Sequence, residues 1–319
     1  MSFSAEKHYE LMVRSAYYYY KQQLTQTEIA SMLGISRLSL GRILKDARDE
    51  GVVTIEINDR RNLLKCLECE IALKEKYGLK NAVVAPEAQG GDVEYAIAKS
   101  AAEYISSVIR PGMTVSLAWG KTINTMVNIL PENKNIKDLN VLTLVGGGGT
   151  TDSTMQPGML AGSFLSKYNG SGYVINAPFF CRSEESCASI KKEPGVADVL
   201  KRCAESDISI VGIGEKPHTK DDYWAYKVYG QAEIERIISQ GAVGDICGIY
   251  INAGGNECCD NITGRIVAAS LEDLKKSKCV IALAGGRGKC ESVKAALAGN
   301  YIDVLITDLD TAGKLIDVH

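Results

Sequence analysis

Histidine and long apolar stretches are scarce in this sequence. Of the three histidines, only His218 lies between residues 9 and 318, so a histidine-based acid–base relay has a single candidate. No apolar run is long enough to cross a bilayer as a helix. The first thirty residues alternate charged, polar and aromatic side chains, without the apolar stretch of a secretory signal peptide. We therefore expect a cytoplasmic protein that does not bind a membrane.

The charge balance excludes a protein that is basic throughout. Lys and Arg number 36 against 39 Asp and Glu, which gives a formal net charge of -3 over 319 residues. Any contact with DNA must therefore be confined to one module. With 45% apolar and 24% charged residues, the composition is that of an ordinary globular chain, long enough for two or three domains.

The ten cysteines are scattered along the chain rather than forming a short disulfide framework, which favours reduced thiols in the core. Cys66 and Cys69 form a C-x-x-C pair. A zinc site would need a second pair of ligands, but Cys258 and Cys259 are adjacent rather than spaced. A redox pair would follow a strand, whereas this segment has helical periodicity. The sequence therefore predicts no metal site and no cofactor.

The stretch QTEIASMLGISRLSLGRIL, residues 26–44, predicts a helix-turn-helix. Ala30 is a small residue where the two helices must approach each other, and Gly34 can adopt a positive φ at the turn. Thr25 and Glu28 have the spacing of a capping box. The apolar positions that would hold these helices against a third element are Ile29, Leu33, Ile35, Leu40 and Ile43.

The second helix of this motif would present polar side chains to DNA. Ser36 can cap it, which puts Arg37, Ser39 and Arg42 on or near its solvent face. The two arginines could read guanine edges or bind phosphates. Between residues 12 and 48, six basic residues stand against two acidic ones, a local charge of +4 that suits a phosphate backbone. The candidate DNA-binding residues are Thr25, Gln26, Ser36, Arg37, Ser39 and Arg42.

The flanking segments indicate the domain boundaries. Residues 6–21 predict a support helix with Leu11, Val13 and a tyrosine run on its apolar side. The recognition helix would end near Gly51, and the alternating sequence VVTIEI that follows predicts a short strand or wing. We expect a helix-turn-helix DNA-binding domain at 1–57, a linker at 58–62, and an effector-binding domain at 63–319 that opens with a helix over 63–77.

Beyond residue 62, short β-rich runs alternate with helical stretches. The runs are NAVVA, MTVSLAW, VLTLVG, GYVINA, ISIVGIG, CVIALAG and DVLIT. Strands that alternate with helices imply crossover connections and a parallel sheet covered on both faces. The predicted fold class is therefore α/β: an N-terminal helix-turn-helix domain followed by a Rossmann-like domain with a mainly parallel sheet.

Several of these runs end in glycine. In an open parallel sheet such turns gather at the carboxyl edge, where ligands bind, and glycine lets backbone N–H groups approach an anion. Neither a P-loop nor a dinucleotide fingerprint is complete, because Val115 and Pro217 stand where defining glycines would. A small polar or phosphorylated ligand is the expected occupant. The charged residues in or beside these turns are Lys121, Asp245, Arg287 and Lys289.

In these motifs the chain resembles the SorC-type sugar-binding transcriptional regulators of bacteria. TQTEIASMLGISRLSLGRIL is similar to the family's DNA-binding pattern, and its effector-domain patterns are matched by TVSLAWGKT, VGIG, GAVGDICG and LAGGRGKCESVKAALAGNYIDVLITDLDTA. The resemblance implies a sugar-phosphate isomerase-like domain that binds a sugar or sugar phosphate without turning it over. It further implies that Gly120–Thr122 form a wall of a phosphate site, that Asp245 faces the sugar, and that Lys289 faces the phosphate.

The resulting prediction is a transcriptional regulator, not an enzyme, whose binding to operator DNA is modulated by a carbohydrate or sugar-phosphate effector. The resemblance also implies dimers or tetramers that control a sugar catabolic operon. One alternative is a sugar-phosphate isomerase or deaminase with Asp245 and Asp308 as general bases; another is a regulator that responds to a partner protein. The candidate effector-binding residues are Gly120, Lys121, Thr122, Gly147, Gly148, Asp245 and Lys289.

Overall fold

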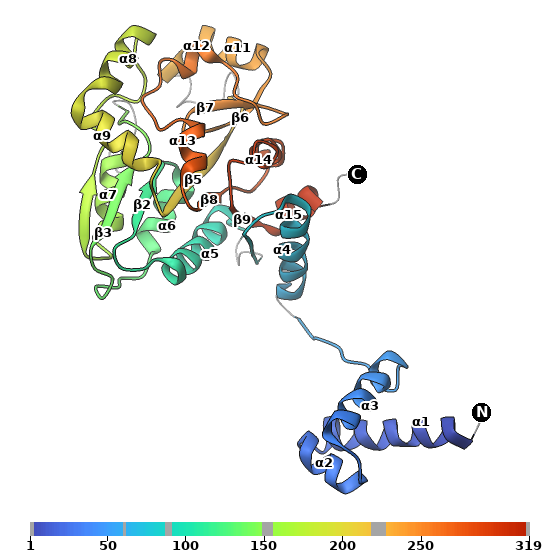
Figure 1. Cartoon of the computed structure of the whole chain (residues 1–319). Coiled ribbons are helices and arrows are strands. Elements are labelled where there is room, and N and C mark those ends of the chain that lie inside the picture. Colours follow the sequence, from blue (N-terminus) through green and yellow to red (C-terminus); the bar gives the residue numbers. More distant parts are fainter. Residues whose placement is uncertain (1–2, 60–61, 87–90, 149–155, 218–227, 317–319) are drawn as a thin grey trace. The chain divides into compact units, whose positions relative to one another are not determined.

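The chain divides into two compact units, Met1–Asp59 and Arg60–His319 (Figure 1). The computed structural model describes residues 3–59, 62–86, 91–148, 156–217 and 228–316. His218 and Gly149, the last glycine of the run GGGG that follows VLTLV, lie outside the described residues.

The smaller unit is helical. Its elements are α1 (Phe3–Ala16), the π-helical turn η1 (Tyr17–Lys21), α2 (Gln26–Leu33) and α3 (Arg37–Asp49). Ile29 and Leu40 are completely buried where α2 packs on α3, and Met12 of α1 packs with Ile43 and Ala47 of α3. The predicted helix-turn-helix is thus confirmed, with α1 as the third element that completes its core.

Two expectations for this unit are wrong in detail. Val13 is 41% exposed, because Met12 and Ala16, four residues apart on α1, form the buried face of that helix instead. The segment VVTIEI, residues 52–57, forms no strand. A strand needs a neighbour with which to exchange backbone hydrogen bonds, and the described residues of this unit contain none.

The larger unit is built on a sheet with nine strands in its described residues. The parallel strands follow the order β1-β9-β8-β5-β2-β3-β4, and each of the β-rich runs in the sequence supplies one of them. Their bounds are β1 (Asn81–Ala85), β2 (Thr114–Leu117), β3 (Leu139–Thr143), β4 (Gly170–Tyr173), β5 (Ile208–Glu215), β8 (Val280–Leu283) and β9 (Val304–Asp308). The predicted mainly parallel α/β domain is confirmed.

Helices cover both faces of this sheet (Figure 1). One face carries α5 (Val93–Val108), α6 (Lys121–Ile129) and α7 (Pro157–Leu165), which connect β1 to β4 in sequence order. The other carries α9 (Pro194–Cys203), α13 (Leu271–Lys276) and α14 (Lys289–Ala298), together with α4 (Leu63–Tyr77) and α15 (Leu309–Ile316). The remaining helices are α8 (Glu184–Lys192), α11 (Gln231–Ser239) and α12 (Asp260–Thr263).

The winding of the chain reverses between two neighbouring strands. From β2 the chain moves outward through β3 to β4, whereas from β5 it moves the opposite way through β8 to β9. Right-handed crossovers therefore place the helix after β2 and the helix after β8 on opposite faces. Doubly wound sheets bind ligands outside the carboxyl ends of the strands at such a reversal. In this sheet that position lies beyond β2 and β5.

An antiparallel hairpin extends the end of β5 and was not predicted from the sequence. It consists of β6 (Ala242–Ile246) and β7 (Ile249–Asn252). Its two turn residues, Cys247 and Gly248, have φ values of 55° and 81°, as a type I′ turn requires. Because cysteine stands where asparagine or aspartate is usual, the turn signal is hidden in the sequence.

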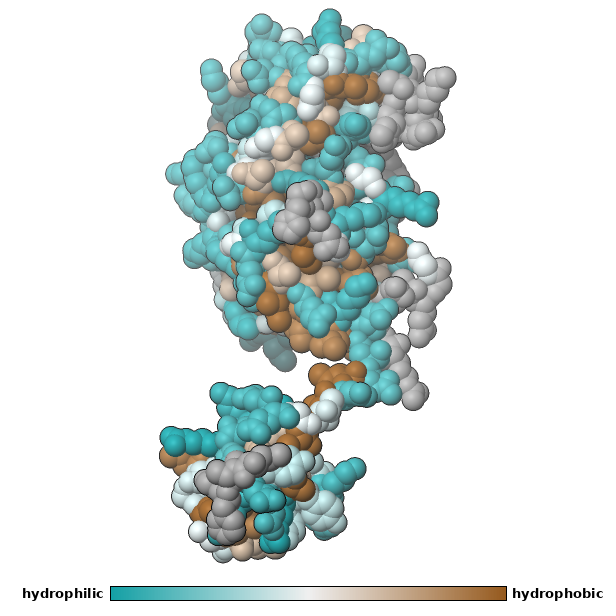
Figure 2. Space-filling model, turned by 90° about the vertical axis from the view of Figure 1, so that its right-hand side faces the viewer, coloured by the Kyte–Doolittle hydropathy of each residue, from teal (hydrophilic) through white to brown (hydrophobic). Residues whose placement is uncertain are grey.

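Most of the cysteines lie in the core. The structure describes all ten cysteines and joins none of them in a disulfide, and Cys66 and Cys69 are buried on the inner face of α4 as core residues. Among the described residues, no helix combines the length and apolar character needed to span a bilayer. On the face drawn in Figure 2, hydrophilic side chains predominate and apolar ones form scattered patches.

Candidate DNA-binding surface and effector site

The first helix of the DNA-binding motif begins with the predicted capping box. The Thr25 hydroxyl accepts a hydrogen bond from the Glu28 backbone N–H (3.3 Å), and a Glu28 carboxylate oxygen accepts one from the Thr25 backbone N–H (2.8 Å). The Thr25 hydroxyl also donates to this carboxylate, and these bonds lower the pKa of Glu28. Gly34 follows α2 with φ 66°, in the left-handed region that the turn requires. The box fixes where α2 begins.

The second helix is capped as predicted. The Ser36 hydroxyl accepts from the Ser39 backbone N–H at 3.0 Å, and the two serine hydroxyl oxygens lie 2.8 Å apart. Both hydroxyl groups therefore take part in hydrogen bonds that cap the N-terminus of α3. Arg37 and Arg42 are exposed on that helix. Of the six predicted DNA-binding residues, all but the half-buried Gln26 are exposed.

A leucine on α3 was missed by the sequence-based list. Leu38 is 71% exposed, between Arg37 and Ser39 in the first turn of the helix. The signal was present in the periodicity, because the buried positions Leu40 and Ile43 leave residue 38 on the opposite side.

In the larger unit, Gly120–Thr122 lie at the reversal of the winding. Gly120 has φ 140° and ψ 159°, a conformation that side chains rarely adopt, and α6 begins at the next residue. The backbone N–H of Ala118 donates to the carbonyl of Ile210 on β5 (2.9 Å). The end of β2 and the first turn of α6, where a helix leaves N–H groups without intrahelical partners, thus lie beside the middle of β5. An anion at this point would meet the N-terminus of α6.

Asp245 lies opposite β5 on the hairpin. Gly214 pairs with Asp245 in the antiparallel register, and a Cβ at position 214 would stand 1.8 Å from an Asp245 carboxylate oxygen. Only glycine leaves room for that carboxylate. The other Asp245 oxygen accepts from the Gly248 backbone N–H at 2.8 Å, which ties the side chain to the hairpin turn. Asp245 therefore has a structural task beside its predicted contact with sugar hydroxyls.

Lys289 lies on the other face of the same strand end. Its Nζ donates to the carbonyl oxygen of Ile213 (2.7 Å) and is 3.9 Å from a carboxylate oxygen of Glu215. Side chains alternate between faces along a strand. Gly214 and Asp245 thus share one face of the β5–β6 pair, while Glu215 and Lys289 lie towards α14. A ligand that contacts both Asp245 and Lys289 must reach around the end of β5.

Comparison with known proteins follows the same division of the chain. Residues 61–317 match a family described as a "Putative sugar-binding domain", and residues 10–66 match a Crp-like helix-turn-helix domain. The transcriptional regulator LsrR of Enterobacter sp. (strain 638) is 30% identical over 309 residues, covering 96% of this chain and 93% of that one. LsrR of Escherichia coli (strain K12) is also 30% identical, with 96% and 94% covered.

Solved structures of transcriptional regulators also match this chain. The full-length sorbitol operon regulator SorC from Klebsiella pneumoniae matches with a TM-score of 0.76 at 27% identity, covering 97% of this chain and 99% of that one. A DeoR family transcriptional regulator from Listeria monocytogenes matches with a TM-score of 0.71 at 26% identity, covering 78% and 99%.

The chain belongs to the SorC-type family of sugar-binding transcriptional regulators. It is thus a transcriptional regulator with a DNA-binding helix-turn-helix and a sugar-binding domain.

Family membership also decides against the enzyme alternative, and the surroundings of Asp308 give that residue a different role. Asp308 is 7% exposed. One carboxylate oxygen accepts from the Gly286 backbone N–H (2.6 Å) and the Thr311 hydroxyl (2.7 Å), and the other from the Thr311 backbone N–H (3.0 Å). In this regulator Asp308 connects the turn after β8 to the first turn of α15.

Gly147 and Gly148 of the regulator use their backbone groups within the protein. The Gly147 N–H donates to the carbonyl of Ala177 at 2.8 Å, and the Gly148 N–H donates to the side-chain oxygen of Gln156 at 3.1 Å. The Gln156 amide returns a hydrogen bond to the Gly148 carbonyl. These two N–H groups are therefore not available to an anion in this conformation. A contact between the effector and this turn stays a prediction.

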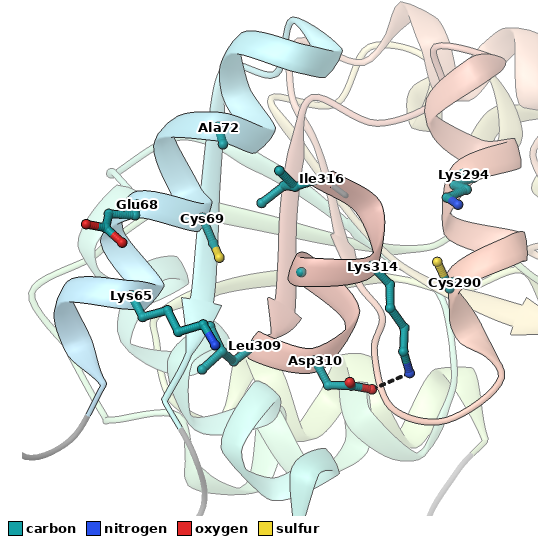
Figure 3. A pocket seen from close by; sticks show the side chains of 11 residues that line it. Lys65, Glu68, Cys69, Ala72, Cys290, Lys294, Leu309, Asp310, Lys314 and Ile316 are labelled. Atoms are coloured by element: carbon teal, nitrogen blue, oxygen red, sulfur yellow. Dashed lines mark hydrogen bonds and ion pairs between the residues drawn. The ribbon is translucent and has the colours of Figure 1, made fainter. Parts of the chain in front are cut away.

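A groove of about 730 Å³ lies elsewhere on the regulator's sugar-binding domain, between α4, α14 and α15 (Figure 3). The thiols of Cys69 and Cys290 point into it from α4 and α14, and Lys314 at its rim pairs with Asp310 at 2.6 Å. None of the predicted effector-binding residues lines this groove, although Cys290, the residue after Lys289, does. The groove lies within one helical layer, among α4, α14 and α15.

Proposed function

We propose that this regulator binds an operator through α3 and that a sugar or sugar phosphate, bound beyond the carboxyl ends of β2 and β5, changes the affinity for that operator. The main support for this effector site is the reversal of strand order between β2 and β5, because α6 begins just after β2 at that point. The names of the relatives support the class of ligand, because one of them is a sorbitol operon regulator. We propose that the regulated genes form a sugar catabolic operon.

On the DNA side, the proposed contacts divide by chemistry. Arg37 and Arg42 are exposed cations that suit guanine edges or phosphates. Thr25, Ser36 and Ser39 lie at the starts of the helices, where exposed hydroxyls and backbone N–H groups suit phosphate oxygens. Gln26 completes the proposed set.

On the effector side, Gly120–Thr122 would bind an anionic or hydroxyl group through the first turn of α6, with the exposed Lys121 adding a positive charge. Asp245 would accept hydrogen bonds from sugar hydroxyls, and Lys289 would pair with a phosphate. Since Asp245 and Lys289 occupy opposite faces of the strand end, the ligand would span that end.

Coupling between the two activities needs more than one copy of the chain. A pair of helix-turn-helix units binds half-sites spaced by whole helical turns, so an effector that changes the arrangement of subunits changes whether both units fit. We therefore propose a dimer or tetramer. We also propose that the regulator acts in the cytoplasm, where bacterial operator DNA lies.

The test follows operator binding by fluorescence anisotropy while sugars and sugar phosphates are added. Ligands are first chosen by thermal shift, because a ligand bound only by the folded state raises the unfolding temperature. Arg42→Ala should weaken operator binding by about tenfold and leave effector affinity unchanged, whereas Lys289→Ala should do the reverse. If none of the ligands that stabilise the protein changes its affinity for the operator, the proposal is wrong.

A further inference from the structure

The outward face of α3 carries an apolar side chain in its first turn. Leu38 is 71% exposed, the highest value among the exposed large apolar residues that the structure describes. From Leu38 to Ala47 the helix makes about two and a half turns at 3.6 residues per turn. Ala47 is completely buried against Met12 of α1. Leu38 therefore points directly away from the core of the unit.

The neighbours of Leu38 on this face are a glycine and two cations. Gly41, Arg42 and Lys45 follow it by three, four and seven residues, which places them on the same side of the helix. Both cations are exposed. The face is thus apolar at its first turn and positively charged along its middle.

Gly41 has no evident task within the protein. Its φ is not in the positive region, and a Cβ at this position would meet no atom within 4 Å. Glycine disfavours a helix relative to alanine. Neither the backbone conformation nor the packing of this unit therefore requires glycine at position 41. A glycine on an exposed helical face instead permits the backbone to approach another molecule closely.

Resting on the proposed operator binding through α3, we propose that Leu38 contacts the C5-methyl group of a thymine in the major groove, and that Gly41 lets α3 come close enough to the base edges for this contact. The first residues of a recognition helix are the ones that reach base edges. The thymine methyl is the apolar feature of the major groove. A leucine side chain offers no hydrogen bond, so it can discriminate bases only through such an apolar contact. Arg42 and Lys45 then lie beside it, where they can pair with phosphates or guanine.

The first test removes only the methyl group from the DNA. A binding sequence is selected from random duplexes with the full-length protein, and each thymine is then replaced singly by uracil. At one position in each half-site, uracil should weaken wild-type binding by about fourfold, the effect of losing one buried methyl group. Leu38→Ala should bind the thymine duplex more weakly and show no further loss with uracil at that position.

A matched control is available on α2. Met32 is 58% exposed, so Met32→Ala removes an exposed apolar side chain from the other helix of the motif. This variant should keep the wild-type sensitivity to uracil. The proposal is overturned if Leu38→Ala keeps that sensitivity at every position. It is also overturned if no single replacement of thymine by uracil weakens binding by the wild type. Circular dichroism checks that each variant retains its helices.

The second test concerns Gly41 and compares the effect of one substitution on protein stability with its effect on operator binding. Gly41→Ala should raise the unfolding temperature of the protein, because alanine is the better helix former and has room here. It should nevertheless weaken operator binding at least fivefold, since the added methyl group separates α3 from the base edges. A variant that is more stable and binds DNA as tightly as the wild type would refute the role given to Gly41.

Discussion

Glu215→Gln should raise the affinity of the effector domain for phosphate. The Glu215 carboxylate lies 3.9 Å from the ammonium group of Lys289. It also lies against Gly288, the residue before α14, because a Cβ at position 288 would be 2.8 Å from a Glu215 oxygen. The carboxylate therefore occupies the space beside Lys289 that a ligand phosphate would use. Glutamine keeps the size of the side chain and removes its charge.

The magnitude follows from the exposure of the pair. The side chains of Lys289 and Glu215 are 25% and 32% exposed. Two charges about 4 Å apart attract by about 4 kcal/mol at an effective dielectric constant of about 20. Loss of hydration and side-chain entropy reduces the net value of exposed pairs to roughly 1 kcal/mol. Removing the competing carboxylate should therefore tighten phosphate binding by about fivefold.

Calorimetric titration with inorganic phosphate and with ribose 5-phosphate measures this change. Glu205→Gln is the matched control, because Glu205 is exposed near the opposite end of β5. The gain in Glu215→Gln should vanish when Lys289→Met is combined with it. Equal phosphate affinity in the wild type, Glu215→Gln and Glu205→Gln would refute the idea that the Glu215 carboxylate competes with phosphate for Lys289. A gain in phosphate affinity that persists when Lys289 is replaced would refute it as well.

Three further predictions concern stability. Thr25→Ala removes the capping box and should destabilise the smaller unit by about 1 kcal/mol in chemical denaturation, whereas an unchanged midpoint would show that the cap contributes nothing. Asp308→Asn replaces one of two accepting oxygens by a donor and should cost about 2 kcal/mol; a smaller loss than for the exposed Asp310→Asn would contradict this.

The third concerns acid. Burial raises the pKa of Asp207, but hydrogen bonds from Lys278 and the Thr114 N–H outweigh it and lower the pKa below 3.8. The resulting stabilisation is present above the unfolded-state pKa and is lost as the pH falls through the lower folded-state value. Asp207→Asn should therefore lose less stability than the wild type as the pH falls below about 4, and an unchanged dependence of stability on acid pH would rule this out.

Much of the molecule was predictable from local sequence. The capping box at Thr25, the glycine at position 34 and the buried periodicity of α2 and α3 act within a few residues of each other, so the helix-turn-helix could be placed from the sequence. The parallel strands were predictable because strands buried on both faces are continuous apolar runs. The helix over Leu63–Tyr77 was predicted with its correct bounds, because its buried residues Cys66, Cys69 and Leu73 recur with helical spacing.

Other features depend on contacts between distant segments. The segment VVTIEI has strand-like alternation but lacks a pairing partner, while the β6–β7 hairpin exists because the end of β5 supplies one. Sequence spacing could not show that the Gly147 and Gly148 N–H groups are already bonded to Ala177 and Gln156.

The sequence by itself thus determined the helix-turn-helix, the strand-forming runs of the parallel sheet and the glycine turns that follow them, since each is specified by the spacing of residues that are near one another in the chain. Only the tertiary structure decided which side chains share a face. It placed Asp245 and Lys289 on opposite sides of β5 and brought Glu215 beside Lys289. These relations depend on strand register and on which helix face finds a partner, and both are set by residues far away in the chain.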